Sequence, residues 1–295
     1  MVENHNSQKV ACVVVTYNRL NLLKRCVESL RSQSCKDFKT IVVNNGSTDG
    51  TAEWLFDQTD ITTINQENLG GAGGFYAGMK RAYEEGYDWI WMMDDDGVTD
   101  KDQLKYLLQG AEIAQSLFVN ALVCNYEEPE KLAFGNTMKG KSINTTREAQ
   151  TYDFIPDSIS PFNGTFIHRE VIKKIGMIKK EMFIWGDETE YSQRARKNGF
   201  KLYTITKAIH YHPSIKFPRS NVFPYVEKFK IAIPPKSRKK ILYRNLGYNS
   251  HYASLKGRAW SISMYVLYYL LRLNFKGLYD YCRYFWMGYN DRYDL

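Results

Sequence analysis

Apolar runs of strand length alternate along the first part of the chain with segments of helical periodicity. The runs at residues 10–16, 38–43 and 89–93 lack internal alternation, which is typical of strands covered on both faces. Residues 20–32 carry apolar side chains on one helical face, at positions 22, 23, 26, 27 and 30. Strands that alternate with helices predict an α/β fold, a doubly wound and mostly parallel sheet with helices on both faces.

The same patterns extend along most of the chain. Further strands are predicted at residues 61–64, 117–124, 161–168 and 203–209. Further helices are predicted at residues 51–57, 75–85 and 100–115, and in a segment that starts near 183 and runs to about 198. Residues 125–160 are polar and irregular and receive no assignment.

Three consecutive carboxylates, Asp94, Asp95 and Asp96, follow a buried run. Adjacent carboxylates repel one another and cost stability unless a cation neutralises them. Oxygen ligands on a tight turn suit a hard divalent cation, Mg²⁺ or Mn²⁺, held jointly with substrate phosphates. The alternative is a solvated acidic turn. In a parallel sheet this turn shares one edge with the polar turns at 17–19 and 44–50, beyond the carboxyl ends of the strands, where ligands bind.

A glycine-rich segment at residues 68–75 precedes a predicted helix. Backbone N–H groups in such a segment can close on an anion, and a helix N-terminus adds a favourable dipole. Asn68, Gly70, Gly71 and Gly74 are therefore candidate cofactor contacts. The spacing fits neither the dinucleotide fingerprint nor the P-loop, and the alternative is a loop whose glycines allow close packing.

Composition and charge narrow the class of protein only modestly. The chain has 295 residues, of which 44% are hydrophobic and 24% charged, as in globular proteins. Five cysteines without metal-site spacing predict reduced thiols in a cytosolic protein, and the polar residues 1–9 do not form a signal peptide. The net charge of +8 suits nucleic acid, an anionic membrane or a phosphorylated substrate, and does not choose among them.

Most of the positive charge lies in the C-terminal tail. Residues 238–295 contain ten Lys and Arg against three Asp, a net +7, and eleven of the 22 tyrosines, which predicts a boundary near residue 234. The apolar stretch 260–271 is too short to cross a bilayer, but the aromatic and cationic residues around it suit a helix at an anionic membrane surface. Packing on the first domain or in a dimer contact is the alternative. No nucleic-acid-binding signature accompanies these residues.

Four runs together resemble a known enzyme family. They are Val-Val-Val-Thr-Tyr-Asn-Arg at 13–19, Val-Val-Asn-Asn-Gly-Ser-Thr-Asp-Gly-Thr at 42–51, Asn-Leu-Gly-Gly-Ala-Gly-Gly-Phe at 68–75 and Met-Asp-Asp-Asp at 93–96. Their order and spacing resemble the inverting nucleotide-sugar glycosyltransferases of family 2, which have a GT-A fold, over roughly residues 8–215. The glycine-rich run is similar to that of galactofuranosyltransferases, with rhamnosyltransferases as near relatives.

The resemblance implies a nucleotide site at the edge of the sheet. Residues expected around the base and ribose are Thr16, Tyr17, Arg19, Asn45 and Asp49. Many family members carry Asp where this chain has Asn45, which bears on the contacts expected with uracil or ribose.

The resemblance also implies a bound Mn²⁺ or Mg²⁺. Asp94 and Asp96 match the metal and diphosphate ligands, whereas Asp95 faces the opposite way along an extended chain, nearer the ribose or donor sugar. Related enzymes use a histidine near the end of the last predicted strand as a further ligand. His210 and His212 are two residues apart and share one strand face, so both are candidates, and we favour His212.

An acidic pair in the stretch 183–191 matches the family's catalytic pair on the acceptor side. Residue-for-residue matching gives Glu188 as the general base that takes a proton from the acceptor hydroxyl, with Asp187 beside it. Acidic residues in a first helical turn are also common as partners of the helix dipole, which is the alternative.

Other candidates concern the acceptor. Trp185 suits a stacking wall for a sugar, although large aromatic residues are more often core. Asn163 and Gly164 suit a bulge or a turn that faces substrate. The unassigned residues 125–160 suit an acceptor-side insertion.

We therefore expect a catalytic GT-A domain at 1–233, with a nucleotide-sugar half at about 8–100 and an acceptor half at about 100–215, followed by a helical, basic and aromatic-rich region at 234–295. The resemblance implies transfer of galactofuranose from UDP-galactofuranose to a cell-surface glycan or lipid-linked acceptor. The enzyme is expected in the cytoplasm. Peripheral binding to the inner face of the membrane and a homo-oligomer are both compatible with the sequence, and no nucleic-acid partner is expected. The alternatives are a rhamnosyltransferase that uses dTDP-rhamnose and a non-catalytic nucleotide- or glycan-binding module.

Overall fold

The structure is a computed structural model that describes residues 8–214 and 218–293. The chain divides into two compact units. Unit 1 comprises Met1–Lys180 and Arg194–Ser214, and unit 2 comprises Glu181–Gln193 and Ile215–Leu295. A short segment from the middle of the chain therefore folds with the C-terminal part, although residues of unit 1 separate the two in the sequence.

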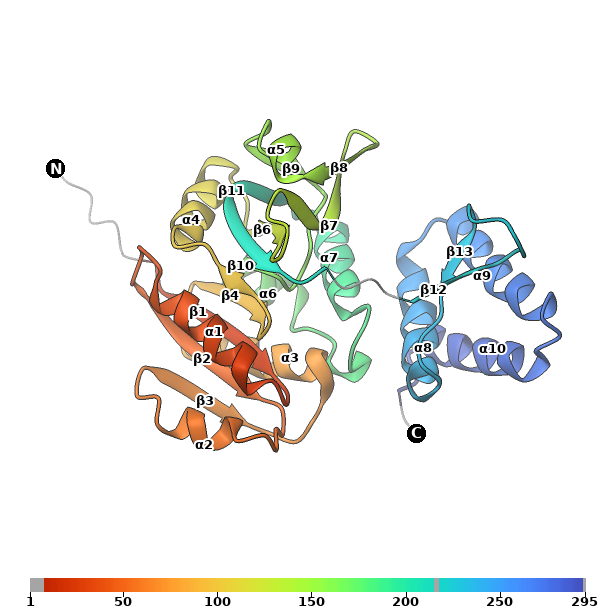
Figure 1. The fold of residues 1–295 in the computed structure, drawn as a ribbon, viewed down its shortest axis with the longest axis horizontal. Helices are drawn as coiled ribbons and strands as arrows, with labels where there is room; N and C mark the ends of the chain where they lie inside the picture. The colour runs from red at the N-terminus through yellow and green to blue at the C-terminus, as the bar shows by residue number, and fades with distance from the viewer. Residues whose placement is uncertain (1–7, 215–217, 294–295) are drawn as a thin grey trace. The chain divides into compact units, whose positions relative to one another are not determined.

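Unit 1 is built around one sheet with the strand order β3-β2-β1-β4-β10-β6-β11-β5 (Figure 1). The first four of these strands are mutually parallel, β10 runs antiparallel between β4 and β6, and β11 is parallel to β6. This mostly parallel arrangement confirms the predicted α/β fold. The strands are β1 (Val10–Thr16), β2 (Phe38–Asn44), β3 (Ile61–Asn65), β4 (Trp89–Asp94), β5 (Val98–Thr99), β6 (Phe118–Asn125), β10 (Thr165–His168) and β11 (Leu202–His212).

The direction of winding reverses at β1. The chain moves from β1 through α1 (Leu20–Arg31) to β2 on one side, and later through α3 (Gly70–Glu84) to β4 on the other side. The carboxyl ends of β1 and β4 are neighbours at this reversal, with Val15 paired to Asp94. Open α/β sheets bind ligands at such a point.

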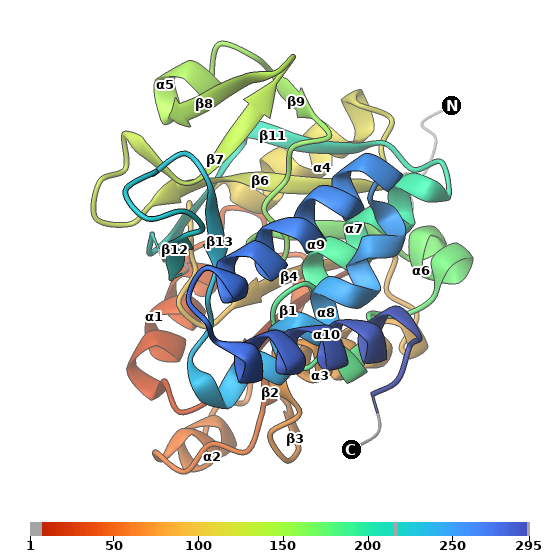
Figure 2. The same ribbon diagram turned by 90° about the vertical axis from the view of Figure 1, so that its right-hand side faces the viewer.

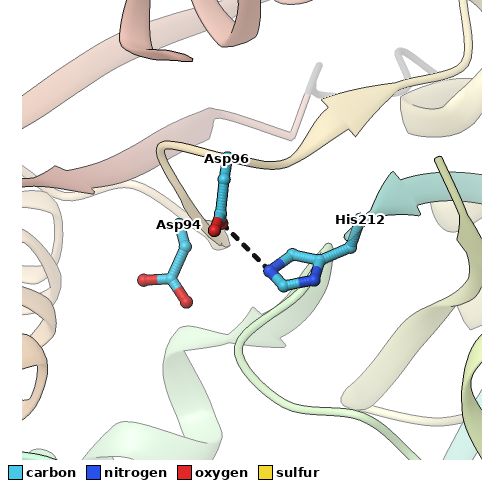
Figure 3. Close-up of side chains that lie close together, drawn as sticks. All are labelled: Asp94, Asp96 and His212. Carbon is cyan, nitrogen blue, oxygen red and sulfur yellow. Dashed lines mark ion pairs between the residues drawn. The ribbon is translucent and has the colours of Figure 1, made fainter. Parts of the chain in front are cut away.

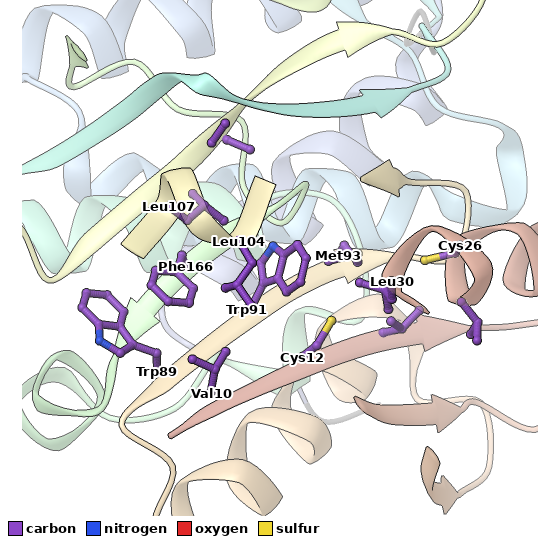
Figure 4. Close-up of a cluster of buried hydrophobic side chains, with 14 of the residues drawn as sticks. Val10, Cys12, Cys26, Leu30, Trp89, Trp91, Met93, Leu104, Leu107 and Phe166 are labelled. Atoms are coloured by element: carbon purple, nitrogen blue, oxygen red, sulfur yellow. The ribbon is translucent and has the colours of Figure 1, made fainter. Parts of the chain in front are cut away.

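Helices cover both faces of the sheet. α1, α2 (Thr51–Phe56) and α4 (Gln103–Ile113) pack on one face, where their apolar side chains meet Trp91 and Met93 of β4 in the main core (Figure 4). α3 packs on the other face of β1. Gly74 and Gly78 of α3 lie so close to the side chains of β1 that a Cβ at either position would overlap a valine. Part of the glycine pattern thus serves close packing of helix on sheet.

Residues 125–160, whose polar and irregular sequence predicts no helix or strand, form a small layer with its own core. It contains β7 (Lys131–Met138), β8 (Lys141–Thr145), α5 (Thr146–Ala149) and β9 (Phe154–Pro156).

The predicted strand at 161–168 is too long, because β10 begins only at Thr165, after a left-handed Gly164 with φ 68°. The predicted strand at 203–209 is too short, because pairing with β6 continues to His212. The helix α6 (Arg169–Ile175) also belongs to unit 1, whereas α7 (Asp187–Lys197) begins in unit 2 and ends in unit 1.

Unit 2 contains the helices α8 (Lys239–Asn249), α9 (Leu255–Leu270) and α10 (Phe275–Tyr289) and the hairpin of β12 (Arg219–Asn221) and β13 (Lys230–Ala232) (Figure 2). Short 3₁₀ turns occur at Lys180–Met182, Lys236–Arg238 and Ser250–Tyr252. Tyrosines Tyr243, Tyr265, Tyr269 and Tyr281 form much of its core. The aromatic residues of the tail therefore pack largely against one another. Among the described helices, none combines the length and the apolar character needed to cross a membrane.

Candidate active site

The turns that follow β1 and β2 are joined by hydrogen bonds. The N–H of Asn18 donates to Ser47 Oγ at 3.0 Å, and the N–H of Thr48 donates to Asn18 Oδ1 at 2.7 Å. The exposed Asp49 accepts the N–H of Leu20 at 2.9 Å, at the start of α1. The two polar turns predicted at this edge thus form one structure, joined through both Asn18 and Asp49.

Asn45 holds the glycine-rich segment to the same edge. It is 2% exposed, its Nδ2 donates to the carbonyl oxygen of Gly70 at 2.7 Å, and its Oδ1 accepts from Gln66 Nε2 at 2.6 Å. Asn68 Oδ1 accepts the N–H of Gly70 at 3.0 Å. An aspartate at position 45 would set a carboxylate oxygen against the Gly70 carbonyl oxygen, so the amide fits these surroundings and a carboxylate would not.

Asp94, Asp96 and His212 come together at the carboxyl ends of β4 and β11 (Figure 3). One ligand atom from each lies within 4.8 Å of the other two, and Nε2 of His212 lies 3.0 Å from Oδ1 of Asp96. Since Mn²⁺ and Mg²⁺ lie about 2.1 Å from their ligands, small side-chain rotations would allow one ion to contact all three residues.

The hydrogen bonds of His212 direct its Nε2 at Asp96. Its Nδ1 lies 2.8 Å from the Pro213 carbonyl oxygen, which can only accept, so Nδ1 carries a proton. Nε2 then meets the carboxylate either as the N–H of an imidazolium or through a lone pair shared with a cation. Burial opposes the charge on His212, but the hydrogen bond and the charge of Asp96 raise its pKa overall.

The electrostatics of the carboxylates favour a bound cation. Burial, together with repulsion from Asp96, raises the pKa of Asp94 to about 7. Burial also opposes ionisation of Asp96, but its hydrogen bond with His212 brings its pKa below the usual range. Two oxygen ligands and one oriented imidazole, in a site that penalises unneutralised charge, fit a hard or borderline divalent ion.

Asp95 is engaged by two of the residues expected around the nucleotide. Thr16 Oγ1 donates to its Oδ2 at 2.7 Å, and Arg19 Nη1 lies 3.2 Å from its Oδ1. Arg19 Nη1 also lies 2.9 Å from Asp96 Oδ2, so one guanidinium bridges two carboxylates. Burial raises the pKa of Asp95 to about 6 despite these contacts. Tyr17, the next residue along, is 45% exposed.

His210 shares the strand face of His212 but does not join the group. Its Nδ1 lies 3.4 Å from Gln103 Oε1, and its ring packs against Gly97, where a Cβ would overlap it. Burial lowers the pKa of His210 to about 3, which keeps the ring neutral. Within the described part of the chain, His212 is the histidine that the fold brings to Asp94 and Asp96.

The candidate acceptor residues lie in both units. In unit 1, the carbonyl oxygen of Asn163 accepts from Asn120 Nδ2 at 3.1 Å, and Gly164 packs so tightly that a Cβ would overlap Gln103. In unit 2, the guanidinium of Arg238 lies 5.4 Å from the centre of the Trp185 ring. Trp185 therefore packs within unit 2, and Asn163 and Gly164 lie in a tight turn.

The acidic stretch forms the first turn of α7. Asp187 and Glu190 are buried, whereas Glu188 is partly exposed. The N–H of Gly186 donates to Glu188 Oε2 at 2.9 Å, and the hydroxyl of Tyr252 donates to Glu190 Oε1 at 2.8 Å. Carboxylates at this position also complement the helix dipole, so the stretch has a structural role in any case.

Comparison with known proteins assigns the family. The family description "Glycosyl transferase family 2" matches residues 11–176, more than half of the chain. The chain belongs to glycosyl transferase family 2. This glycosyltransferase is 33% identical over 217 residues to galactofuranosyltransferase GlfT1 of Mycolicibacterium smegmatis, across 70% of this chain and 72% of that protein. It is 26% identical over 251 residues to dTDP-rhamnosyl transferase RfbF of Shigella flexneri, across 81% and 78% of the two chains.

Two solved structures have a similar fold. Staphylococcus aureus TarS matches 92% of this glycosyltransferase with a TM-score of 0.58 and 14% identity, and GalNAc-T7 with UDP, GalNAc and Mn²⁺ matches 70% with a TM-score of 0.52 and 13% identity. The matches span 54% and 43% of those chains, about half of each. The GT-A fold implied by the resemblance is thereby confirmed. Family membership implies a nucleotide-sugar donor and a glycan acceptor.

Sequence reasoning missed several polar side chains that hydrogen-bond the candidate residues or their turns, each within its own unit of this glycosyltransferase. They are Gln66, Gln103, Asn245, Asn249 and Tyr252. Each is an isolated polar residue within an ordinary helix, strand or loop pattern. Their partners lie 21 to 107 positions away, so no local pattern pointed to them.

Proposed function

We propose that this family 2 glycosyltransferase moves galactofuranose from UDP-galactofuranose to a cell-surface glycan or lipid-linked acceptor, with inversion at the anomeric carbon. The observation that carries the proposal is the 33% identity to a galactofuranosyltransferase across 72% of that protein. The glycine-rich run at 68–75 supports the same donor. The 26% identity to a dTDP-rhamnosyl transferase makes transfer of rhamnose the second candidate.

Asp94, Asp96 and His212 would hold Mn²⁺ or Mg²⁺. Their donor atoms lie within 4.8 Å of one another, and the Pro213 carbonyl fixes the imidazole with Nε2 towards the carboxylates. A bound ion would neutralise the departing diphosphate. Arg19, 2.9 Å from Asp96, adds positive charge beside the same carboxylates.

Tyr17 is our candidate for contact with the nucleotide base, because it is exposed at the carboxyl end of β1. Thr16, Arg19, Asn45 and Asp49 would shape the pocket for base and ribose, each from a position already held by hydrogen bonds. The phosphate contacts would come from Asn68, Gly70 and Gly71, whereas Gly74 packs against Val15 of β1. A Cβ at Gly71 would meet nothing within 4 Å, which leaves room for a ligand there.

Glu188 is proposed as the general base, on the family resemblance. Its carboxylate would take the proton of the acceptor hydroxyl while that oxygen forms the new bond to the anomeric carbon. The bond between that carbon and the diphosphate breaks at the same time, and UDP leaves with the electron pair. A single displacement of this kind inverts configuration and needs no enzyme nucleophile. Asp187 would complete the acidic pair, and Trp185, Asn163 and Gly164 would contact the acceptor.

The tip of the α9–α10 hairpin is proposed as a membrane contact. Leu270, Leu271, Leu273 and Phe275 are 41%, 49%, 77% and 65% exposed, and Lys276 follows them. Apolar side chains beside cations suit an anionic lipid surface, where a lipid-linked acceptor would be found. The double variant Leu273→Ser/Phe275→Ser should co-sediment with anionic vesicles less than the wild type does. Neutral vesicles should bind neither the wild type nor the double variant. Equal binding of the wild type and the double variant to anionic vesicles would reject the membrane contact. Sedimentation velocity in the absence of lipid tests whether the protein forms a homo-oligomer.

UDP release by the purified full chain with Mn²⁺ tests the function. The donors are UDP-galactofuranose, UDP-galactopyranose, UDP-glucose and dTDP-rhamnose, each with a pool of short lipid-linked glycans as acceptor. Turnover with UDP-galactofuranose alone supports the proposal. Turnover with dTDP-rhamnose alone would make dTDP-rhamnose the donor in place of UDP-galactofuranose. Calorimetric binding of UDP with Mn²⁺ but no turnover with any donor would favour the non-catalytic binding module.

A further inference from the structure

The turn that leads into α7 has a strained backbone. Phe183 and Trp185 have left-handed φ angles of 64° and 66°, and Gly186 has a φ of 109°. Residues with side chains avoid this region because Cβ crowds the following carbonyl oxygen, so they adopt it only where surrounding contacts hold them there. Whatever holds this turn also determines where the next residues lie, including Glu188.

Two asparagines of α8 hold the turn through its carbonyl groups. Asn245 Nδ2 lies 2.8 to 2.9 Å from three carbonyl oxygens, those of Met182, Ile184 and Trp185. Asn249 Nδ2 donates to the carbonyl oxygen of Gly186 at 2.9 Å. The two asparagines are four residues apart and therefore lie on one face of α8. Together the two NH₂ groups lie within hydrogen-bond distance of four carbonyl oxygens of a five-residue segment, and the two N–H donors of Asn245 are shared among three of them.

The orientation of Asn245 follows from these partners. Only its NH₂ group can face three acceptors, since the amide oxygen would be repelled by them. Its Oδ1 has no hydrogen-bond partner among the described residues, and the residue is 1% exposed. An unpaired buried amide oxygen is unfavourable for folding. The hydrogen bonds of Asn245 therefore stabilise the turn more than the side chain stabilises α8.

The face of α8 that carries the asparagines is itself held in place. α8 and α10 approach so closely that a Cβ at Gly247 would overlap the backbone of Phe285, and one at Gly288 would overlap the backbone of Arg244. Arg244 is 6% exposed, and its Nη2 donates to the carbonyl oxygen of Glu181 at 3.1 Å, just before the turn. The helix pair thus forms a rigid support for residues 181–186.

We infer that Asn245 and Asn249 are positioning residues for the carboxylate of Glu188. The inference rests on the proposed function, in which Glu188 is the general base. The connection is short: Asn249 binds the carbonyl of Gly186, and the N–H of Gly186 binds Glu188 Oε2 at 2.9 Å. The C-terminal region then takes part in catalysis through α8, independently of any role at a membrane.

A double-mutant cycle on the full chain tests this inference. The variants are Asn245→Ala, Asn249→Ala, Glu188→Gln and each asparagine variant combined with Glu188→Gln. Asn290→Ala is the matched control, because its exposed amide also bonds a carbonyl, that of Trp286 at 2.8 Å, but far along the chain from the turn. The readouts are kcat, the KM for donor, calorimetric binding of UDP with Mn²⁺, and hydrogen exchange of peptides that contain residues 182–188.

Displacement of a catalytic group by about 1 Å lowers the rate on the order of 10²-fold, so we expect Asn245→Ala to lose about that much in kcat. Asn249→Ala should lose less, and the donor KM and UDP binding should stay within about twofold in both variants, as in Asn290→Ala. Residues 182–188 should exchange faster in both asparagine variants. In the Glu188→Gln background, neither asparagine change should lower kcat further by more than about twofold, because both act through the same group.

Several results would overturn the inference. Independent, multiplicative losses in the combined variants would show that the asparagines do not act through Glu188. If both asparagine variants keep the wild-type kcat and the wild-type rate of hydrogen exchange at residues 182–188, Asn245 and Asn249 do not position Glu188. That result would leave the assignment of Glu188 as the general base intact. Wild-type kcat in Glu188→Gln would reject the base assignment and the inference with it. If Asn245→Ala does not fold, Asn249→Ala, which loses one hydrogen bond, decides between the same outcomes.

Discussion

Replacing Asp94 by asparagine should stabilise the metal-free protein at pH 8 and remove its response to Mn²⁺. Burial, together with repulsion from Asp96, raises the pKa of Asp94 to about 7, against about 3.9 for an aspartate in an unfolded chain. An acid whose pKa is higher in the folded state holds its proton more tightly when folded. The folded protein therefore loses stability as the pH rises from about 4 to about 7, and the loss is complete at pH 8.

The size of this loss follows from the pKa difference. About three pH units at about 1.4 kcal/mol each give about 4 kcal/mol. Asp94 is partly exposed, and we halve the value for screening by solvent, to about 2 kcal/mol. Asparagine has the same shape without the charge. Asp94→Asn should therefore raise the free energy of unfolding by about 2 kcal/mol at pH 8 and change it little near pH 4, where the wild-type side chain is protonated.

Urea unfolding in EDTA at pH 8 and at pH 4.5 measures both values, and thermal unfolding with Mn²⁺ and UDP measures the response to metal. Asp60→Asn is the control, because it removes an exposed ion pair with Arg31, 2.8 Å long. It should lower stability by less than about 1 kcal/mol and leave the Mn²⁺ response intact. If Asp94→Asn is less stable than the wild type at pH 8 in EDTA, or still responds to Mn²⁺, the electrostatic argument for a cation at this turn is refuted.

Three further predictions concern binding, catalysis and packing. Asp96→Ala should abolish Mn²⁺-dependent binding of UDP in calorimetry, because it removes a ligand and the partner of His212; undiminished binding would remove Asp96 from the metal site. Glu188→Gln should leave that binding unchanged and lower kcat by about 10²- to 10⁴-fold, the usual contribution of a general base, whereas near-normal turnover would point to another base. Gly78→Ala should lower the free energy of unfolding by about 1 to 3 kcal/mol in urea, because its Cβ would overlap Val13. Gly71→Ala, whose Cβ meets nothing within 4 Å, should change stability by less than about 1 kcal/mol, and equal effects of the two glycine changes would contradict the packing argument.

Features that depend on near neighbours in the chain could be predicted from the residues alone. The apolar run at 89–93 predicted β4, because an uninterrupted run of this length has to be buried on both faces. The three aspartates predicted a site for a cation, because the repulsion between adjacent carboxylates is present in any fold. The glycine pattern at 68–75 was ambiguous, since a short loop can bind an anion or allow close packing. In the structure Gly74 packs on β1, whereas Gly71 lies open.

Other features depend on packing between distant parts of the chain. Strand alternation gives His210 and His212 the same face and does not choose between them. In the structure the ring of His210 packs against Gly97, and the ring of His212 contacts Asp96. The segment that carries Glu188 folds with the C-terminal region because Asn245, about 60 positions away, binds its carbonyl groups. A single buried amide changes no periodicity and no composition. Its role arises only when helix packing brings its NH₂ group within 3 Å of those oxygens, so the tertiary structure alone could reveal it.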